Sequence, residues 1–378
     1  MKKINAIGCA LAATLTVGAA APAFAQDYVG TAKKNKIVGS PADDRILALG
    51  GKDKVWGGDG RDRIDGAGGN DRIYAGTGDD SVDGGAGKDR IFGEAGNDGI
   101  AGGDGNDRID SGDGRDWVSG DAGNDRLRAG NGDPTRLDTE RPGHLGANLS
   151  GAEGKDRLAS GAGNDELLGG SGNDKANAGA GNDAVFGGAD DDKLTGSVGD
   201  DVVNGDAGDD KVKGGPGNDL VLGGEGRDRV LGGAGDDVLS NASRGWYGSD
   251  DWTTSDTVPS EGDVFKGGAG NDTFGDEYDG LVTGLFKALG GVGDDTFWLG
   301  DVDADSVIKP GAGNDKIYVK NPTKGLRIKC GAGVDTVYFN IAVKKVKAKG
   351  CESVLYGSDP FHFDPEGWHD VWWRQTAG

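Results

Sequence analysis

The chain consists largely of a nine-residue repeat that holds one large apolar residue per copy. In the copy GGDGNDRID, residues 102–110, aspartate stands at position 6 and isoleucine at position 8. The same frame runs without a slip through ten copies over residues 39–128 and through ten more over residues 151–240. One copy has too little apolar surface to fold alone. The copies must therefore stack and share a core, as in a solenoid.

Each copy predicts a six-residue glycine-rich turn followed by a three-residue strand, because glycine at positions 2 and 4 permits positive φ and close backbone approach. Within the strand, the side chains at positions 7 and 9 point one way and the side chain at position 8 points the other. Two copies per coil give a repeat of 18 residues, with coils about 4.8 Å apart. The predicted fold class is all-β, a parallel β-roll or β-helix solenoid built from two nonapeptides per coil.

The aspartate at position 6 creates an electrostatic problem in such a stack. Carboxylates recur at one edge in every coil, and repulsion between two neighbours is roughly 1 kcal/mol in water and larger at a protein edge. A hard divalent cation between the turns relieves this repulsion, and flexible all-oxygen coordination favours Ca²⁺ over Mg²⁺. No cysteine or histidine accompanies the rows, which argues against zinc. The alternative is that these aspartates only form turns.

The repeat resembles the RTX, or haemolysin-type, nonapeptide GGxGxDxUx, a calcium-binding β-helix repeat. The resemblance covers residues 39–128 and 151–240 almost without gaps. It implies a parallel β-roll with multiple calcium ions between the turns on both edges, and folding coupled to calcium. About sixteen to eighteen ions fit if two coils share each ion. The implied ligands are the position 6 aspartates: Asp44, Asp53, Asp62, Asp71, Asp80, Asp89, Asp98, Asp107, Asp116, Asp125, Asp156, Asp165, Asp174, Asp183, Asp192, Asp201, Asp210, Asp219, Asp228 and Asp237.

The N-terminus has the features of a cleaved signal peptide. Lys2 and Lys3 precede an apolar run over residues 6–21, and Ala23-Phe24-Ala25 forms a small-x-small cleavage site. No later stretch approaches the length of a membrane span. We therefore expect an extracellular protein. RTX toxins and proteases usually leave by a type I route without such a leader, so that part of the resemblance does not transfer.

The composition limits the partners of the chain. The formal net charge is −23, which disfavours nucleic acid and anionic membranes and favours cations such as calcium. Cys9 lies in the leader, which leaves Cys330 and Cys351 in the mature chain. These two lie 21 residues apart, close to one coil, so we expect them on adjacent rungs and within reach of a disulfide.

Position 7 carries basic residues on one face of each block: Lys54, Arg72, Arg90, Arg108 and Arg126 in the first, and Arg157, Lys175, Lys193, Lys211 and Arg229 in the second. If residues 129–150 make a single lengthened turn, both rows lie on one face. Such a ladder either docks an anionic polymer or acidic surface, or solubilises the sheet. The opposite face of the second block carries an apolar row that includes Val202, Leu220 and Val238, and we expect a later segment to cover it.

Beyond residue 258 the Asp-x-apolar signature persists at wider spacing. Its aspartates are Asp263, Asp272, Asp295, Asp305, Asp315 and Asp335. Three glycine-rich turns that recur every 20 residues predict wider coils with larger core residues. Asp272, Asp295 and Asp315 are the further predicted calcium ligands. Leucines spaced four apart in residues 280–291 predict one short helix on a coil.

The C-terminal tail is rich in aromatic residues, among them Trp368, Trp372 and Trp373. We expect it to cap the terminal coil, the alternative being a carbohydrate-binding platform. His362 and His369 then pack within the cap. The expected organisation is a signal peptide (1–25), an N-terminal lead-in (26–38), a first calcium-binding block (39–128), an insertion loop (129–150), a second block (151–240), a second insertion loop (241–257), a wider-coil solenoid (258–357) and an aromatic cap or tail (358–378).

These features together predict a secreted calcium-binding protein that serves as an extracellular structural or binding and adhesive module, and not an enzyme. The alternative is an extracellular polysaccharide-modifying enzyme, a lyase or hydrolase with a carboxylate pair on the solenoid surface. The chain has no HExxH, no Gly-x-Ser-x-Gly and no long non-repeat stretch for a separate catalytic domain. It also lacks the long apolar segment that a pore-forming toxin requires.

Overall fold

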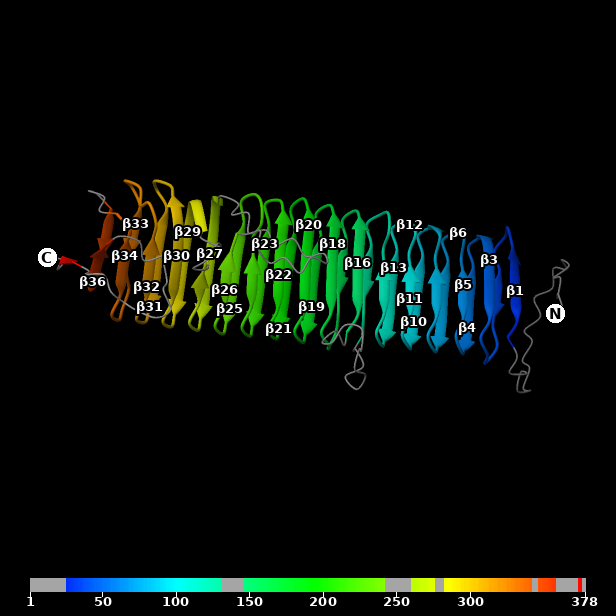
Figure 1. Cartoon of the computed structure of the whole chain (residues 1–378). Helices are drawn as coiled ribbons and strands as arrows, with labels where there is room; N and C mark the ends of the chain where they lie inside the picture. The colour runs from blue at the N-terminus through cyan, green and yellow to red at the C-terminus, as the bar shows by residue number, and fades with distance from the viewer. Residues whose placement is uncertain are drawn as a thin grey trace. The chain divides into compact units, whose positions relative to one another are not determined.

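The computed structural model describes residues 25–130, 146–241, 260–275, 282–341 and 346–357, together with the backbone of residues 373–375. The chain divides into two compact units, Met1–Asp174 and Lys175–Gly378. Within each unit, short parallel strands lie side by side in successive coils (Figure 1). The described residues contain no helix, and hence none that could cross a membrane. This architecture confirms the predicted all-β parallel solenoid.

The first unit is a stack of parallel strands in which each strand pairs with the strand one coil away. Lys54 pairs with Arg72, and Arg72 with Arg90, so the register advances by one 18-residue repeat. The strands are β1 (Asp27–Thr31), β2 (Lys36–Val38), β3 (Arg45–Gly51), β4 (Lys54–Asp59), β5 (Arg63–Asp65), β6 (Gly68–Gly69), β7 (Arg72–Thr77), β8 (Ser81–Asp83), β9 (Ala86–Gly87), β10 (Arg90–Ala95), β11 (Gly99–Ala101), β12 (Asp104–Gly105), β13 (Arg108–Asp113), β14 (Trp117–Ser119), β15 (Arg126–Arg128), β16 (Asn148–Glu153), β17 (Arg157–Ala159) and β18 (Glu166–Ser171).

The second unit repeats this arrangement and then widens. Its strands are β19 (Lys175–Ala180), β20 (Ala184–Ala189), β21 (Lys193–Val198), β22 (Val202–Ala207), β23 (Lys211–Pro216), β24 (Leu220–Leu222), β25 (Arg229–Ala234), β26 (Val238–Ser240), β27 (Ser260–Ala269), β28 (Thr273–Phe274), β29 (Val282–Val292), β30 (Thr296–Val302), β31 (Val307–Ala312), β32 (Lys316–Val319), β33 (Arg327–Lys329), β34 (Thr336–Phe339), β35 (Lys347–Lys349), β36 (Ser353–Tyr356) and β37 (Trp373–Gln375). All described pairings within the unit are parallel except that of β36 with β37.

The core of each coil is thin because position 8 supplies its only large side chain. Every position 8 residue of the two blocks is at most 4 % exposed, from Ile46 to Leu239. Positions 6 and 1 also face inward, since they lie two residues to either side along the extended chain. Position 1 holds glycine, alanine or serine, so the apolar contribution per coil rests on two aliphatic side chains.

The solenoid begins before the first recognised repeat. In β1 and β2, Tyr28 pairs with Ile46 and Ile37 pairs with Val55. Residues 26–38, which we expected to be a lead-in, therefore form a coil of the same kind. Gln26 and Asn35 stand where aspartate stands in later coils, and that substitution hides the coil from the repeat pattern.

The first insertion lengthens a single coil. Arg126 of β15 pairs with Arg157 of β17, and Trp117 of β14 pairs with Asn148 of β16. A single lengthened turn predicts this pairing, because it keeps each strand on the same face as before the insertion. The basic row of the first unit therefore continues across the insertion. Residues 148–150 belong to strand β16 and not to a loop, which shortens the expected insertion.

The expected helix in residues 280–291 is wrong, because this segment forms strand β29. Its side chains alternate between buried and exposed, with Phe286 and Ala288 in the core and Leu285 39 % exposed. A spacing of four residues is a multiple of the strand period as well as near the helical one. Pairing with β27 and β31 on either side decides between the two.

Larger core residues fill the wider coils of the second unit, as predicted. Phe265, Phe274, Phe297 and Phe339 are at most 1 % exposed, and the rings of Phe274 and Phe297 stack with centroids 4.2 Å apart. In the apolar row of the opposite face, Val202 and Leu220 are half-buried and Val238 is 37 % exposed, so the expected cover of this row is only partial.

The C-terminal end of the second unit is held by a disulfide and an added strand. Cys330 and Cys351, which follow the paired strands β33 and β35, form a disulfide with Cα atoms 5.1 Å apart. Strand β37 pairs with β36 in antiparallel orientation and thereby covers that edge of the sheet.

Several expectations fall outside the described residues. These are the signal peptide up to residue 24, most of the first insertion (131–145), the second insertion (242–259), and the tail residues 358–372 and 376–378, which include His362, Trp368, His369 and Trp372.

We predict that Phe297→Ala destabilises the second unit by about 3–5 kcal/mol, because it removes a buried ring stacked on Phe274. Thermal and urea unfolding of the calcium-loaded protein, followed by circular dichroism, measures the effect. Lys316→Ala is the control, since that side chain is exposed on the outward side of β32. Equal destabilisation by the two variants would contradict the assignment of Phe297 to the core.

Candidate metal centres

The position 6 aspartates line up in rows along the edges of both units. All predicted ligands are buried, with at most 4 % of each residue exposed. In the first unit, the Asp44 row is Asp44, Asp62, Asp80, Asp98, Asp116 and Asp165, and the Asp53 row is Asp53, Asp71, Asp89, Asp107, Asp125, Asp156 and Asp174. In the second unit, the Asp183 row is Asp183, Asp201, Asp219, Asp237, Asp272, Asp295, Asp315 and Asp335, and the Asp192 row is Asp192, Asp210, Asp228 and Asp263.

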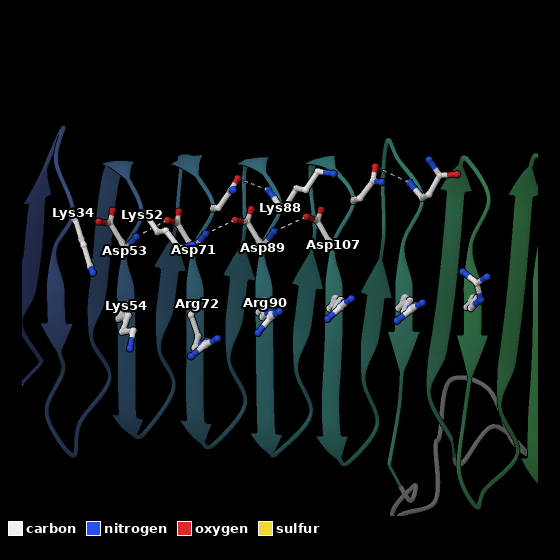
Figure 2. A pocket seen from close by; sticks show the side chains of 16 residues that line it. Lys34, Lys52, Asp53, Lys54, Asp71, Arg72, Lys88, Asp89, Arg90 and Asp107 are labelled. Carbon is white, nitrogen blue, oxygen red and sulfur yellow. Dashed lines mark hydrogen bonds between the residues drawn. The ribbon is translucent and has the colours of Figure 1, made fainter.

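A hydrogen bond between successive coils fixes each carboxylate. The backbone N–H of Asp53 donates to Oδ1 of Asp71 at 2.7 Å, that of Asp71 to Asp89 at 2.6 Å, and that of Asp89 to Asp107 at 2.8 Å (Figure 2). Each aspartate thus donates through its backbone to one neighbour in the row and accepts through Oδ1 from the other. The carboxylates are held in orientation before any ion binds.

The second carboxylate oxygen is left without a hydrogen-bond donor in most of the row members. Oδ2 is buried and unpartnered in Asp53, Asp62, Asp71, Asp80, Asp89, Asp98, Asp107, Asp116, Asp125, Asp156, Asp201, Asp210, Asp219, Asp228, Asp237, Asp272, Asp295 and Asp315. A buried charged oxygen with no partner is costly, commonly by several kcal/mol. A repeated set of such atoms indicates a cationic ligand.

Backbone carbonyls lie beside these oxygens, in space that only glycine or another small residue leaves open. A Cβ added to Gly57 would collide with both Oδ2 of Asp62 and the carbonyl oxygen of Ala75 in the next coil. At Gly76, where φ is +123°, an added Cβ would collide with the carbonyl oxygen of Gly58. The glycines therefore keep carbonyl oxygens accessible next to the carboxylates.

This donor set fits calcium. The described residues contain no group of three His, Cys, Asp or Glu side chains that could hold a metal ion, so a cation here must take many of its ligands from the backbone. Hard oxygen donors from carboxylates and carbonyls in a flexible turn are the ligands that Ca²⁺ prefers, whereas zinc sites use nitrogen and sulfur.

Burial raises the pKa values of the row carboxyls. Desolvation raises the pKa of Asp89, Asp98 and Asp125 to about 7, and that of Asp210 and Asp295 to about 8. The hydrogen bond from the preceding backbone N–H opposes this shift, and repulsion from the row neighbours adds to it. Each row therefore gains either protons or cations when the protein folds.

The rows are not continuous. In the first unit, Ala147 takes the position between Asp116 and Asp165, and its N–H donates to Oδ1 of Asp165 at 2.6 Å. The intervals on either side of Ala147 therefore have a carboxylate on one side only. The expected sixteen to eighteen ions required that each pair of adjacent coils shares an ion. That condition is not met at Ala147.

The Asp192 row ends at Asp263. Phe286, Ser306 and Leu326 follow it in register and are at most 3 % exposed, so the wider coils carry aspartate along the Asp183 row alone. We expected Asp305 to continue the Asp-x-apolar signature, and this is wrong. Asp305 is exposed, and Ser306 takes the buried position in the row.

The predicted ligands do not include Asp263 and Asp335, although Asp263 belongs to the Asp192 row and Asp335 to the Asp183 row. Asp263 accepts from the N–H of Asp228, and Asp335 accepts from that of Asp315. Both residues show the Asp-x-apolar signature, and this signal in the sequence could have identified them as row members.

The repeats that carry the rows match a known family. The family model described as RTX calcium-binding nonapeptide repeat matches residues 29–64, 38–73, 65–100, 101–135, 150–185, 177–212, 204–239 and 260–274, which together make up more than half of the chain. The chain matches no protein in a search of curated sequences.

We predict that the metal-stripped protein loses stability as the pH rises. A carboxyl whose pKa is raised by folding binds more protons in the folded state, so its contribution is present below about pH 4 and is lost as the pH passes through about 7. Without metal, the β signal in far-ultraviolet circular dichroism should therefore be greater at pH 5 than at pH 8. A β signal that rises with pH in the metal-stripped protein would contradict this prediction.

Proposed function

The chain belongs to the family of RTX calcium-binding nonapeptide repeat proteins, and on this premise we propose that it is a secreted module whose coils fold when several calcium ions bind the aspartate rows. The folded module serves outside the cell as a structural or binding and adhesive element. The single observation that carries the proposal is the series of buried Oδ2 atoms without donors, which recurs along the rows in most of the described coils beside open backbone carbonyls.

Calcium, when bound, supplies the positive charge that neutralises neighbouring carboxylates. The chain's own residues orient the ligands, since each Oδ1 is held by a backbone N–H of the preceding coil. The core of the two nonapeptide blocks contributes less than in an ordinary domain, because position 8 supplies only two aliphatic side chains to each coil there. Folding should then depend on ion binding, since ligation contributes only in the folded state.

Export through the N-terminal leader is part of the same proposal. The charged residues Lys2 and Lys3, the apolar run and the small-x-small site support it. An oxidising compartment also suits the disulfide between Cys330 and Cys351.

The proposed role is non-catalytic. The carboxyls with raised pKa values are the natural candidates for acid–base chemistry, but they are buried in rows and bonded to backbone N–H groups. That arrangement suits ligation of a cation rather than proton transfer to a polysaccharide.

Calcium titration of the metal-stripped protein tests the proposal. We expect a cooperative gain of β signal in far-ultraviolet circular dichroism, because each coil provides ligands that its neighbour completes. An unchanged spectrum with chelator and with excess Ca²⁺ would overturn calcium-dependent folding.

Two variants within one repeat test the ligand assignment. Asp107→Asn should raise the calcium concentration at the midpoint of folding and lower the cooperativity, because it removes a charge from a buried row. Asp104→Asn, three residues earlier and exposed, should leave both unchanged. Equal behaviour of the two variants would contradict a ligand role for position 6. Recovery of the protein from culture medium without residues 1–25, shown by mass spectrometry, tests export.

A further inference from the structure

A groove runs along the Asp53 row of the first unit, between a line of basic strand residues and a line of turn residues that mixes lysine with asparagine (Figure 2). Its floor is the row of buried aspartates. One rim comes from turn residues and includes Lys34, Lys52 and Lys88. The other rim comes from position 7 of the strands and consists of Lys54, Arg72, Arg90, Arg108, Arg126 and Arg157, which pair in register one coil apart. We call this feature the basic groove.

The bases of the strand rim are available to a ligand. Arg90, Arg108 and Arg126 are exposed, and none of the three makes an ion pair with any carboxylate in the described part of the chain. Elsewhere such pairs do form, as between Arg128 and Asp110 at 3.4 Å. Neutralisation of neighbouring surface acids therefore does not account for the strand rim.

The opposite face of the same coils lacks such a row. There, position 7 begins with Arg45 and Arg63 and continues with Ser81, Gly99 and Trp117. Both faces have the same backbone repeat, and each follows a row of aspartates of its own, so the repeat itself does not require bases at position 7. The charge is concentrated on one face of a chain whose net charge is −23.

We propose that the basic groove is a docking site for an acidic polysaccharide, a linear polymer with carboxylate groups at regular intervals. The inference rests on the proposed function in one respect. Calcium bound along the floor cancels the charge of the aspartates, so that the basic rims make the electrostatic potential of the groove positive. A row of cations repeated about every 4.8 Å matches a polymer with repeated charges better than a single folded partner. Carboxylate is also an oxygen ligand that calcium accepts.

The aromatic residues beside the groove disfavour a nucleic acid as the occupant. Trp56, Tyr74 and Phe92 follow the basic residues by two positions and stack on one another, with centroids 5.6 and 4.9 Å apart and planes within 8° of parallel. Nucleic-acid bases would need to stack on the faces of these aromatic rings, and most of those faces are already covered by the neighbouring ring. Recognition depends on the charged rims.

Binding of galacturonic acid oligomers too short to gel tests the proposal, with the full-length protein in calcium throughout. Arg90→Gln/Arg108→Gln/Arg126→Gln should weaken binding about tenfold or more, since three exposed ion pairs are lost. The control, Arg45→Gln/Arg61→Gln/Arg63→Gln, removes the same charge from two strand positions of the opposite face and from the turn beside them, where Arg61 pairs with Asp79, and should bind like the unaltered protein. Added NaCl should weaken binding, because exposed charges are screened.

Circular dichroism of each sample separates the two hypotheses. Absence of β signal for the unaltered protein in calcium contradicts the proposed function, whereas a folded protein that does not bind contradicts only the docking site. If the triple variant fails to fold, Arg108→Gln against Arg63→Gln gives the same comparison, with an expected weakening of about twofold. Equal affinity of the groove and control variants overturns the proposal, as does equal affinity for a neutral maltodextrin. Tighter binding of duplex DNA than of the oligomers overturns the assignment to a polysaccharide.

Discussion

Repulsion between buried aspartates in adjacent coils is the constraint on which the other features of this protein depend. Stacking brings carboxylates into rows, burial raises the pKa values of many of them, and most of their Oδ2 atoms lack donors. Ion pairs such as Arg61 with Asp79 and Arg227 with Asp209 lie at exposed side chains outside the rows, so the charge that neutralises the rows is expected to come from bound ions. The glycine-rich turns complement this arrangement by leaving carbonyl oxygens open beside the carboxylates, so that the element that creates the repulsion also provides the means of relieving it.

The balance between charge and apolar packing changes within the second unit. In its first coils, two rows of aspartate accompany a core of aliphatic side chains. Beyond Asp263, one of the rows is replaced by Phe286, Ser306 and Leu326, while phenylalanines enlarge the core. A disulfide and the antiparallel strand β37 secure the same end. Apolar burial and covalent closure thus replace part of what ion binding contributes elsewhere.

Much of this architecture could be predicted because the repeat is both regular and chemically simple. An aspartate every nine residues defines the rows, and an aliphatic residue two positions later defines the core, so the coil length and the parity of the faces follow. Prediction failed where the pattern carried less information. The coil at residues 26–38 lacks aspartate, and the leucine spacing in residues 280–291 fits helix and strand alike.

The sequence by itself determined the solenoid, its 18-residue period and the residue types available to an ion, because periodicity in an extended chain directly specifies which side chains share an edge. Only the tertiary structure decided which coils lie next to one another across an insertion. Ala147 interrupts a row and the Asp192 row ends early because pairing between strands, and not distance along the chain, sets the neighbour of each aspartate. The same pairing aligns Arg126 with Arg157 and so extends a row of bases that the sequence alone left conditional.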